Sequence, residues 1–348
     1  MKLAPSRISP IFVPRIWGTR TLAPLFETPP GPEPIGEVWL TGDRCVFATG
    51  PLEGRSLGEV WPTLSAEWSG SDVENAPRIP LLVKFIFPDA KLSVQVHPSD
   101  TYAREHEAAA GGMGKTEMWY AVAARENAEV RLGLVPGVTR ETFGRAIADG
   151  TVEDCLKRVP VHAGDAIFVP AGTAHTIGPG MVLCEVQQHS DLTYRVFDYN
   201  RVQSDGKPRP LHLRQALEVM HFGEQAGGKV EPVRIQHGPL VETYFAACQY
   251  FATELWEFSE RIAAVTSPKR FELLIPISGQ GHIEWSSESA AYGPAEVWFL
   301  PAGLGAYQIK PQSTTKLLRT YVPDLNEFAQ QLSDQKIPES VWSRLVHP

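Results

Sequence analysis

The sequence predicts a mainly β protein, a β-sandwich or barrel with few helices. Its 348 residues include 30 Pro and 29 Gly, which separate many short apolar and β-branched runs. This pattern is typical of short strands joined by turns, and it favours an all-β architecture. Hydrophobic residues at 43% and charged residues at 21% indicate a soluble globular chain, long enough for one large or two ordinary domains.

The order of expected elements supports this fold class. After an irregular segment at 1–36, strand-like runs are expected at 35–42, 81–87, 91–97, 116–124, 128–135, 163–188, 243–258, 269–285, 295–303 and 306–310. The runs at 81–87 and 91–97, joined by Pro88-Asp89, have a hairpin pattern. Short helices are expected near 57–66, 100–110, 211–222 and 324–335. A small helical insertion at 139–159 is expected to form two short helices, because Gly150 interrupts it.

Charge and hydropathy exclude several classes of partner. The formal net charge is −8 and no basic run occurs, so we expect no nucleic-acid partner. The most apolar run, at 80–88, is too short to span a bilayer and contains Lys84, so we expect no membrane association. The N-terminus has no uninterrupted apolar stretch of the kind found in signal peptides.

Cysteine usage indicates a reducing compartment. The four cysteines are far apart and show no CxxC spacing, which argues against a zinc ribbon or a disulfide framework. They are Cys45, Cys155, Cys184 and Cys248. We therefore expect buried thiols and a cytoplasmic location.

A polar face on one strand is the first sign of a site. Leu92, Val94 and Val96 alternate with Ser93, Gln95 and His97, so period two places the three polar side chains on one side. Such a row on the inner side of a sheet is costly unless something binds there.

A second motif lies around His175. Residues 164–175 have the spacing G-x5-P-x-G-x2-H, which resembles the second motif of the cupin superfamily. In that superfamily, the Pro-x-Gly turn returns a strand into a small β-barrel and directs its His into the interior. Two imidazoles from His97 and His175, the Glu117 carboxylate and the Gln95 amide oxygen then form a plausible Zn²⁺ site with room for water or substrate. Iron, manganese or cobalt would also fit this donor set.

Several longer motifs together point to one family. QVHPSD, GKTEMWY, PAGTAHTIG and QQHSDLTYRVFDYNR resemble the short bacterial class of type I mannose-6-phosphate isomerase over about residues 10–225. The resemblance implies a cupin-type barrel or jelly roll that holds one zinc ion per chain. Its ligands would be Gln95, His97, Glu117 and His175.

The resemblance also implies roles for matching positions. Arg195 matches the active-site arginine, and Lys115 and Asp191 match residues near the reacting carbons. The substrate or phosphate pocket would be lined by Lys84, Ser93, Arg201 and Glu37. Gly114 departs from the larger relatives, which carry a His before the Lys, and this puts in doubt any mechanism that uses such a His. Ser99 also departs from the usual HPDD or HPDK.

A weak internal similarity predicts a second β-unit. DAIFVPAGTA at 165–174 resembles EVWFLPAGLGA at 296–306, but Ala306 stands where His175 would align. We expect a catalytic metal-binding domain at 1–235 and a degenerate cupin-like β-domain without metal at 236–348.

The preferred function is a metal-dependent isomerase that interconverts mannose 6-phosphate and fructose 6-phosphate through an enediol. One alternative is another cupin metalloenzyme, such as a dioxygenase, although Gln95 replaces the first His of the usual HxH pair. Another is a non-catalytic sugar-phosphate-binding protein. The base stays open among Lys115, Asp191 and a metal-bound hydroxide. We expect a small sugar phosphate as partner and a monomer or homodimer.

Overall fold

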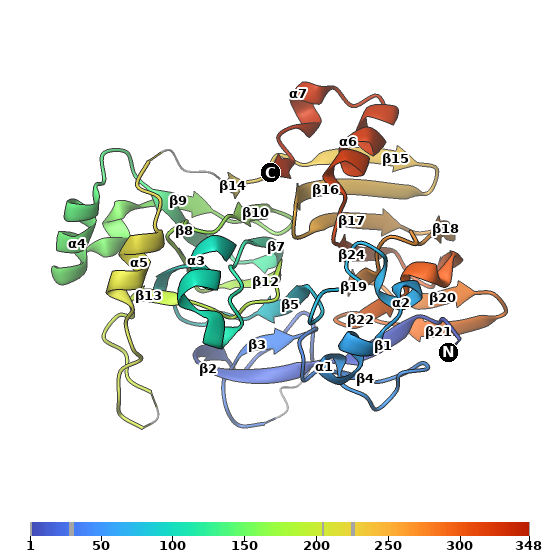
Figure 1. The fold of residues 1–348 in the computed structure, drawn as a ribbon, viewed down its shortest axis with the longest axis horizontal. Coiled ribbons are helices and arrows are strands. Elements are labelled where there is room, and N and C mark those ends of the chain that lie inside the picture. The colour runs from blue at the N-terminus through green and yellow to red at the C-terminus, as the bar shows by residue number, and fades with distance from the viewer. Residues whose placement is uncertain (1, 28–30, 204, 224–226, 348) are drawn as a thin grey trace.

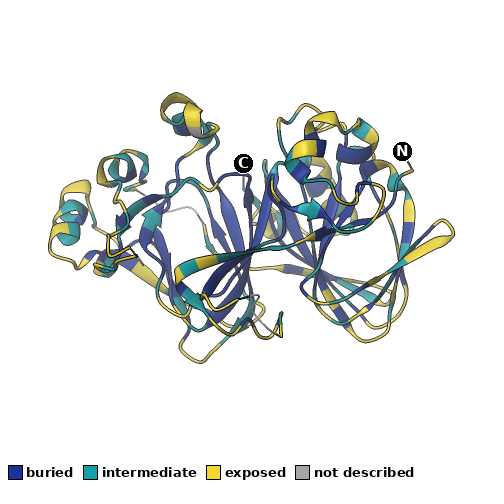
Figure 2. Ribbon diagram, turned by 90° about the horizontal axis from the view of Figure 1, so that it is seen from below, coloured by how far each residue is buried: buried dark blue, intermediate teal, exposed yellow. Residues whose placement is uncertain are grey.

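The computed structural model describes residues 2–27, 31–203, 205–223 and 227–347. Two β-sandwich units lie side by side, each built from a large and a small sheet (Figure 1). The strands of both units consist mostly of buried residues, and exposed residues concentrate on loops and helices (Figure 2). The predicted mainly β, cupin-type fold is confirmed, although the sheets of each unit stay separate and do not close into a barrel in the described part of the chain.

The first unit contains a seven-stranded and a five-stranded antiparallel sheet. The larger sheet has the order β14 (Gly228–Lys229), β10 (Ala166–Val169), β7 (Glu117–Ala124), β12 (Met181–Gln188), β5 (Leu81–Ile86), β3 (Ile35–Trp39) and β2 (Ile11–Thr19). The smaller sheet has the order β13 (Tyr194–Phe197), β6 (Val94–Val96), β11 (His175–Ile177), β8 (Glu129–Leu134) and β9 (Leu156–Pro160). The candidate site lies between these two sheets.

The second unit contains a nine-stranded and a four-stranded sheet. The order of the larger is β15 (Val233–His237), β16 (Leu240–Cys248), β17 (Ala252–Phe258), β24 (Thr315–Tyr321), β19 (Glu272–Ser278), β22 (Val297–Leu300), β1 (Ser6–Ser9) and β4 (Val46–Phe47), with β25 (Val346–His347) parallel to β16. The smaller has β18 (Ile262–Val265), β23 (Ala306–Pro311), β20 (Gly281–Trp285) and β21 (Glu288–Tyr292). Because β1 pairs with β22, an N-terminal strand completes the second unit. The division at 235/236 stays a prediction.

The helices are short and lie outside the sheets (Figure 1). They are α1 (Leu57–Val60), α2 (Ala66–Ser69), α3 (Asp100–His106), α4 (Arg140–Ala148), α5 (Leu213–Val219), α6 (Leu325–Asp334) and α7 (Glu339–Trp342), with 3-10 turns at Trp61–Thr63, Ala108–Ala110, Val152–Cys155 and Ala302–Leu304. No helix in the described ranges is long and apolar enough to cross a bilayer. The four cysteines are buried and unpaired.

The insertion at 139–159 is only partly as predicted. Thr139 caps α4 by a capping box with Thr142, and the helix ends before Gly150, whose φ is +72°. The second expected helix is present only as a short 3-10 helix, and the end of the range is a strand. Residues after Gly150 form a single 3-10 turn and then β9, where Val159 pairs with Val130 of β8. Pairing with a free sheet edge overrides the local helical pattern.

The predicted hairpin at 81–97 is wrong. Both edges of β5 are already occupied by β3 and β12, and all six of its residues are buried. The chain therefore crosses to the opposite sheet, where β6 pairs with β11 and β13. This crossing places the polar face of β6 opposite Glu117.

Candidate metal centre and active-site cavity

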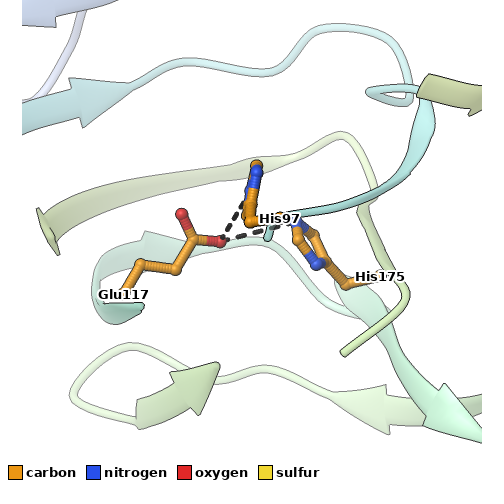
Figure 3. A group of neighbouring side chains, drawn as sticks. All are labelled: His97, Glu117 and His175. Atoms are coloured by element: carbon orange, nitrogen blue, oxygen red, sulfur yellow. Dashed lines mark ion pairs between the residues drawn. The ribbon is translucent and has the colours of Figure 1, made fainter. Parts of the chain in front are cut away.

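Three buried ligand groups converge from both sheets of the first unit. His175 opens β11 and pairs in register with Gln95 of β6, while Glu117 opens β7 in the facing sheet. Glu117 Oε1 lies 3.6 Å from His97 Nε2 and 3.4 Å from His175 Nε2 (Figure 3). One ligand atom from each of these three residues falls within 4.8 Å of the others, a spacing suited to a shared metal ion.

Backbone carbonyls fix both imidazoles in the orientation that a metal requires. His97 Nδ1 is 2.9 Å from the carbonyl oxygen of Leu192, and His175 Nδ1 is 2.9 Å from that of Thr173. Each Nδ1–H donates to its carbonyl, so each Nε2 presents a lone pair toward Glu117. His97 Nε2 is buried and has no hydrogen-bond partner among the described residues. An orphaned buried nitrogen of this kind fits a metal ligand.

Gln95, the fourth expected ligand, lies next to these three residues. Its side-chain amide nitrogen is 3.2 Å from His175 Nε2, and Ser93 Oγ donates to its Oε1 at 3.1 Å. The amide group therefore lies at the edge of the cluster, with its conformation set by a neighbour on the same strand face. The predicted set of four ligands is brought together in one place.

The electrostatics favour the protonation states of metal ligands. Burial lowers the pKa of His97 and lowers that of His175 to about 4, so both rings are neutral at pH 7. Burial alone would raise the pKa of Glu117, but Lys115 and His97 hold it well below its usual value. Two neutral imidazoles beside an ionised carboxylate fit a divalent cation.

A cavity of about 510 Å³ opens beside this cluster. Most of the predicted catalytic and substrate-binding residues line it: Glu37, Lys84, Ser93, Lys115, Asp191 and Arg195, together with the ligands Gln95 and Glu117. His97 and His175 lie behind this wall, at 2% and 0% exposure. Arg201 does not line the cavity. Its guanidinium donates to Asp198 and to the carbonyl of Lys91.

Lys115 is held between two carboxylates at the cavity floor. Its Nζ is 2.9 Å from Glu117 Oε2 and 3.3 Å from Glu185 Oε1. Burial would lower the pKa of Lys115, but Glu117 and Glu185 raise it above its usual value, so the side chain is an ammonium. Burial raises the pKa of Glu185 to about 7, against the opposing effect of Lys115. A proton donor and a carboxyl group that titrates near neutrality therefore lie side by side.

A second ion cluster forms the adjoining wall. Lys84 Nζ is 2.7 Å from Asp191 Oδ1 and 3.9 Å from Glu37 Oε2. Arg15 binds Glu37 with two hydrogen bonds, and Trp39 Nε1 donates to the same carboxylate. Although burial opposes it, Lys84 is the leading cause that lowers the pKa of Asp191 to about 2. The two cations of this wall, Arg15 and Lys84, are therefore balanced by its two carboxylates, Glu37 and Asp191.

Four titratable residues that line the cavity were not predicted from the sequence. They are Arg15, Glu185, Arg209 and His212. Glu185 had a detectable signal, because it is a carboxylate within the apolar strand MVLCEVQQ. Arg209 and His212 had none, since they lie on an irregular connection whose path only the fold determines.

The fold explains why position 114 is a glycine. A Cβ on this residue would lie 2.5 Å from the backbone nitrogen of Asp100. The backbone of 98–100 therefore leaves no space for a histidine before Lys115 on this path. The proton chemistry must use other groups.

The second unit repeats the frame without the metal donors. Strand β22 occupies the position of β10, because Leu300 pairs with Glu272 as Val169 pairs with Glu117. On the facing sheet, Ala306 pairs with Val265 where His175 pairs with Gln95. Both of these donors are thus replaced by apolar residues, and the only buried group of three or more possible metal ligands in the described ranges is the one in the first unit.

In the second unit, a guanidinium lies beside Glu272, the acid that stands where Glu117 stands in the first unit. By register, Arg319 stands where Glu185 does, and Glu254 stands where Lys84 does. Arg319 donates to Glu272 and Glu254, both fully buried. The second unit thus carries a buried ion network at the position of the metal centre.

Comparisons with known proteins identify relatives of the whole chain. The sequence profile described as "Mannose-6-phosphate isomerase, cupin domain" matches residues 241–322, inside the second unit. The chain is 34% identical over 320 residues to mannose-6-phosphate isomerase ManA of Bacillus subtilis, covering 89% of this chain and 97% of that protein. It is 33% identical over 299 residues to the mannose-6-phosphate isomerase of Streptococcus mutans, covering 84% and 91%.

Two solved structures are similar to this chain in fold. A mannose 6-phosphate isomerase from Bacillus subtilis has a TM-score of 0.83 at 29% identity, covering 91% of this chain and 99% of that one. A phosphomannose isomerase from Salmonella typhimurium has a TM-score of 0.73 at 16% identity over 91% and 99% of the two chains, and so shares the fold.

Proposed function

Because this chain belongs to the mannose-6-phosphate isomerase family, we propose that it interconverts D-mannose 6-phosphate and D-fructose 6-phosphate in the cavity beside the His97–Glu117–His175 cluster. The observation that carries the proposal is the junction of that cluster with a cavity that contains buried proton-transfer groups. Aldose–ketose isomerisation requires both, since charge develops on the C1 and C2 oxygens while a proton moves between these carbons.

We infer that the bound metal is one zinc ion, held by His97, Glu117, His175 and the Gln95 amide. Two neutral imidazoles, a carboxylate and an amide oxygen are suitable zinc donors. When bound, the ion would supply Lewis acidity toward the substrate oxygens. The Nδ1–H groups of His97 and His175 are bonded to backbone carbonyls and Glu117 is ionised, which are the states that a metal ligand needs.

The protein groups divide into proton carriers and positioning groups. Lys115, as an ammonium, is placed to donate a proton or a hydrogen bond to a substrate oxygen, and Asp191 and Glu185 are the carboxylates that can exchange one. Arg195, next to Gln95 in register, can stabilise developing negative charge without titrating. Glu37, Lys84 and Ser93 present polar groups for the sugar hydroxyls.

Two other functions fit less well. A cupin dioxygenase would carry a His where Gln95 stands. A non-catalytic sugar-phosphate-binding protein would not need Lys84 and Lys115 buried in ionic clusters, because burying each charge costs several kcal/mol unless it is paired. The unpaired buried cysteines support a reducing, cytoplasmic location. A monomer or homodimer remains our prediction of the assembly.

A metal-reconstitution assay tests the function. Protein stripped by a chelator should be inactive, and added Zn²⁺ should restore conversion of mannose 6-phosphate to fructose 6-phosphate in a coupled assay. In His97→Ala and in His175→Ala, elemental analysis should find less than one metal ion per chain. Turnover should fall by at least about 100-fold in each. Arg214→Ala is the control, since Arg214 is exposed and forms a surface ion pair with Glu218. No turnover with any divalent metal would refute the isomerase assignment.

A further inference from the structure

One side of the cavity mouth carries an excess of positive charge. On this side the cavity is lined by Arg195 of β13 and by Gln203, Arg209 and His212, which follow β13 on the connection to α5. Arg201 and Arg209 are both paired with the buried carboxylate of Asp198, and Arg195 adds a third guanidinium that forms no ion pair with it among the described residues. Asp205 and Lys207, which are also on the connection, are exposed and offset each other. On the floor of the cavity, by contrast, the Lys115 ammonium is paired with Glu117 and Glu185.

Two cations that were expected to line the substrate or phosphate pocket, Lys84 and Arg201, are already paired with other groups. The Lys84 ammonium is buried at 2% exposure against Asp191, so its charge is already compensated. Arg201 lies outside the cavity lining and is bonded to Asp198 and to a backbone carbonyl. The cations that do line the mouth are Arg195 and Arg209.

The guanidinium of Arg209 is held in place by Asp198, and its Nη1 group is available to donate to a ligand. Its Nε and Nη2 donate to the two oxygens of Asp198, and no described residue accepts from its Nη1. Because Asp198 also accepts a hydrogen bond from Arg201, one carboxylate holds two arginines of the connection between β13 and α5. A guanidinium fixed in this way binds an anion with little further loss of conformational entropy.

His212 and Arg195 add donors of defined orientation. The backbone N–H of Arg195 donates to His212 Nδ1 at 3.2 Å, and the backbone N–H of His212 returns a bond to the Arg195 carbonyl at 2.8 Å. With Nδ1 as acceptor, the neutral His212 ring carries its proton on Nε2, as a donor. Arg195 Nη1 is bonded to the carbonyl of Pro210, while its Nε–H is buried with no partner among the described residues.

We propose that Arg209, held by Asp198, forms with His212 and Arg195 the subsite for the phosphate group, and that Arg209 makes the enzyme selective for phosphorylated over free sugar. This inference rests on the proposed function. A phosphate dianion requires several charge-assisted donors, and these three residues supply them on one side of the mouth. With the phosphate held by these three residues, the carbonyl end of the sugar is free to lie toward the metal cluster.

The test compares phosphorylated and free sugar. Arg209→Ala should raise KM for mannose 6-phosphate by about 10- to 100-fold, the effect of one or two charge-assisted hydrogen bonds, with kcat changed by less than about threefold. Turnover of unphosphorylated mannose should change by less than about threefold. Arg209→Lys should recover part of the loss, and Asp198→Asn should resemble Arg209→Ala. Arg214→Ala, on the exposed face of α5, is the control with unchanged KM.

Direct binding provides an independent readout. The Kd for inorganic phosphate, measured by calorimetry on the metal-loaded protein, should rise at least about 10-fold in Arg209→Ala and stay unchanged in Arg214→Ala. An unchanged KM and phosphate Kd in a folded Arg209→Ala protein would overturn the subsite, as would an equal loss on both sugars. If the wild type fails to isomerise mannose 6-phosphate, the proposed function fails, while the phosphate measurement still decides the subsite.

Discussion

At the scale of single residues, Glu185 couples the site to the stability of the fold. Its carboxyl group is buried beside Lys115 in the floor of the cavity, and burial raises its pKa from an ordinary value of 4.5 to about 7. Between these two pH values the folded protein holds a proton that the unfolded chain has lost. Stability must therefore fall as the pH rises through this window.

Substitution of Glu185 isolates this effect. In metal-free protein, Glu185→Gln should gain stability relative to wild type by up to about 3 kcal/mol between pH 4.5 and pH 8, because each unit of pKa shift corresponds to about 1.4 kcal/mol. Urea unfolding of both proteins at several pH values measures the difference. Parallel pH profiles for the two proteins would show that Glu185 ionises as readily in the fold as in the unfolded chain. Glu260→Gln, on an exposed turn, is the matched control.

At the scale of elements, prediction succeeded where a local pattern determined the outcome. The alternation in 91–97 and the resemblance of the Pro-x-Gly turn before His175 to a cupin motif predicted two inward-directed imidazoles, and both are found in one buried cluster. The hairpin at 81–97 could not be judged locally, because the edges of β5 are filled by β3 and β12 from distant parts of the chain. Arg209 escaped prediction for the same reason, since its partner Asp198 lies across a connection without periodicity.

The repeated strand frame makes Arg319 a buried structural cation. It donates to Glu254 and Glu272 and lies 5.0 Å and 4.8 Å from the ring centroids of Trp256 and Tyr321. Arg319→Met should reduce the free energy of unfolding by about 3–5 kcal/mol, because it leaves two buried carboxylates uncompensated. Chemical denaturation measures the loss.

Two further variants distinguish this network from ordinary surface pairing. Adding Glu254→Leu and Glu272→Leu to Arg319→Met should restore most of the stability, since replacing a whole buried ion group by apolar residues is often neutral. Arg261→Ala breaks only an exposed pair with Glu284 and should cost less than about 1 kcal/mol. If Arg319→Met is as stable as Arg261→Ala, the network is not a structural requirement.

At the scale of the whole molecule, the second unit contacts the site through a chain of hydrogen bonds. No residue beyond 212 lines the described cavity, so the second unit acts from outside it. Tyr250, in the turn between β16 and β17, donates to Asp100 Oδ2 at 2.7 Å. Asp100 Oδ1 accepts from the Gly114 backbone and from Gln188, and Gln188 Oε1 accepts from the Thr116 backbone. These bonds hold the segment that carries Lys115 and Glu117.

Removal of the Tyr250 hydroxyl should therefore affect the site as well as stability. Tyr250→Phe is expected to cost about 1–3 kcal/mol of stability, as for a hydrogen bond to a charged group, and to weaken metal binding measured by chelator competition by about 3- to 10-fold. Tyr292→Phe is the matched control, because Tyr292 hydrogen-bonds Thr315 within the second unit. It should lose similar stability with unchanged metal affinity. Equal metal affinity in both variants would mean that the second unit stabilises the chain without positioning the metal ligands.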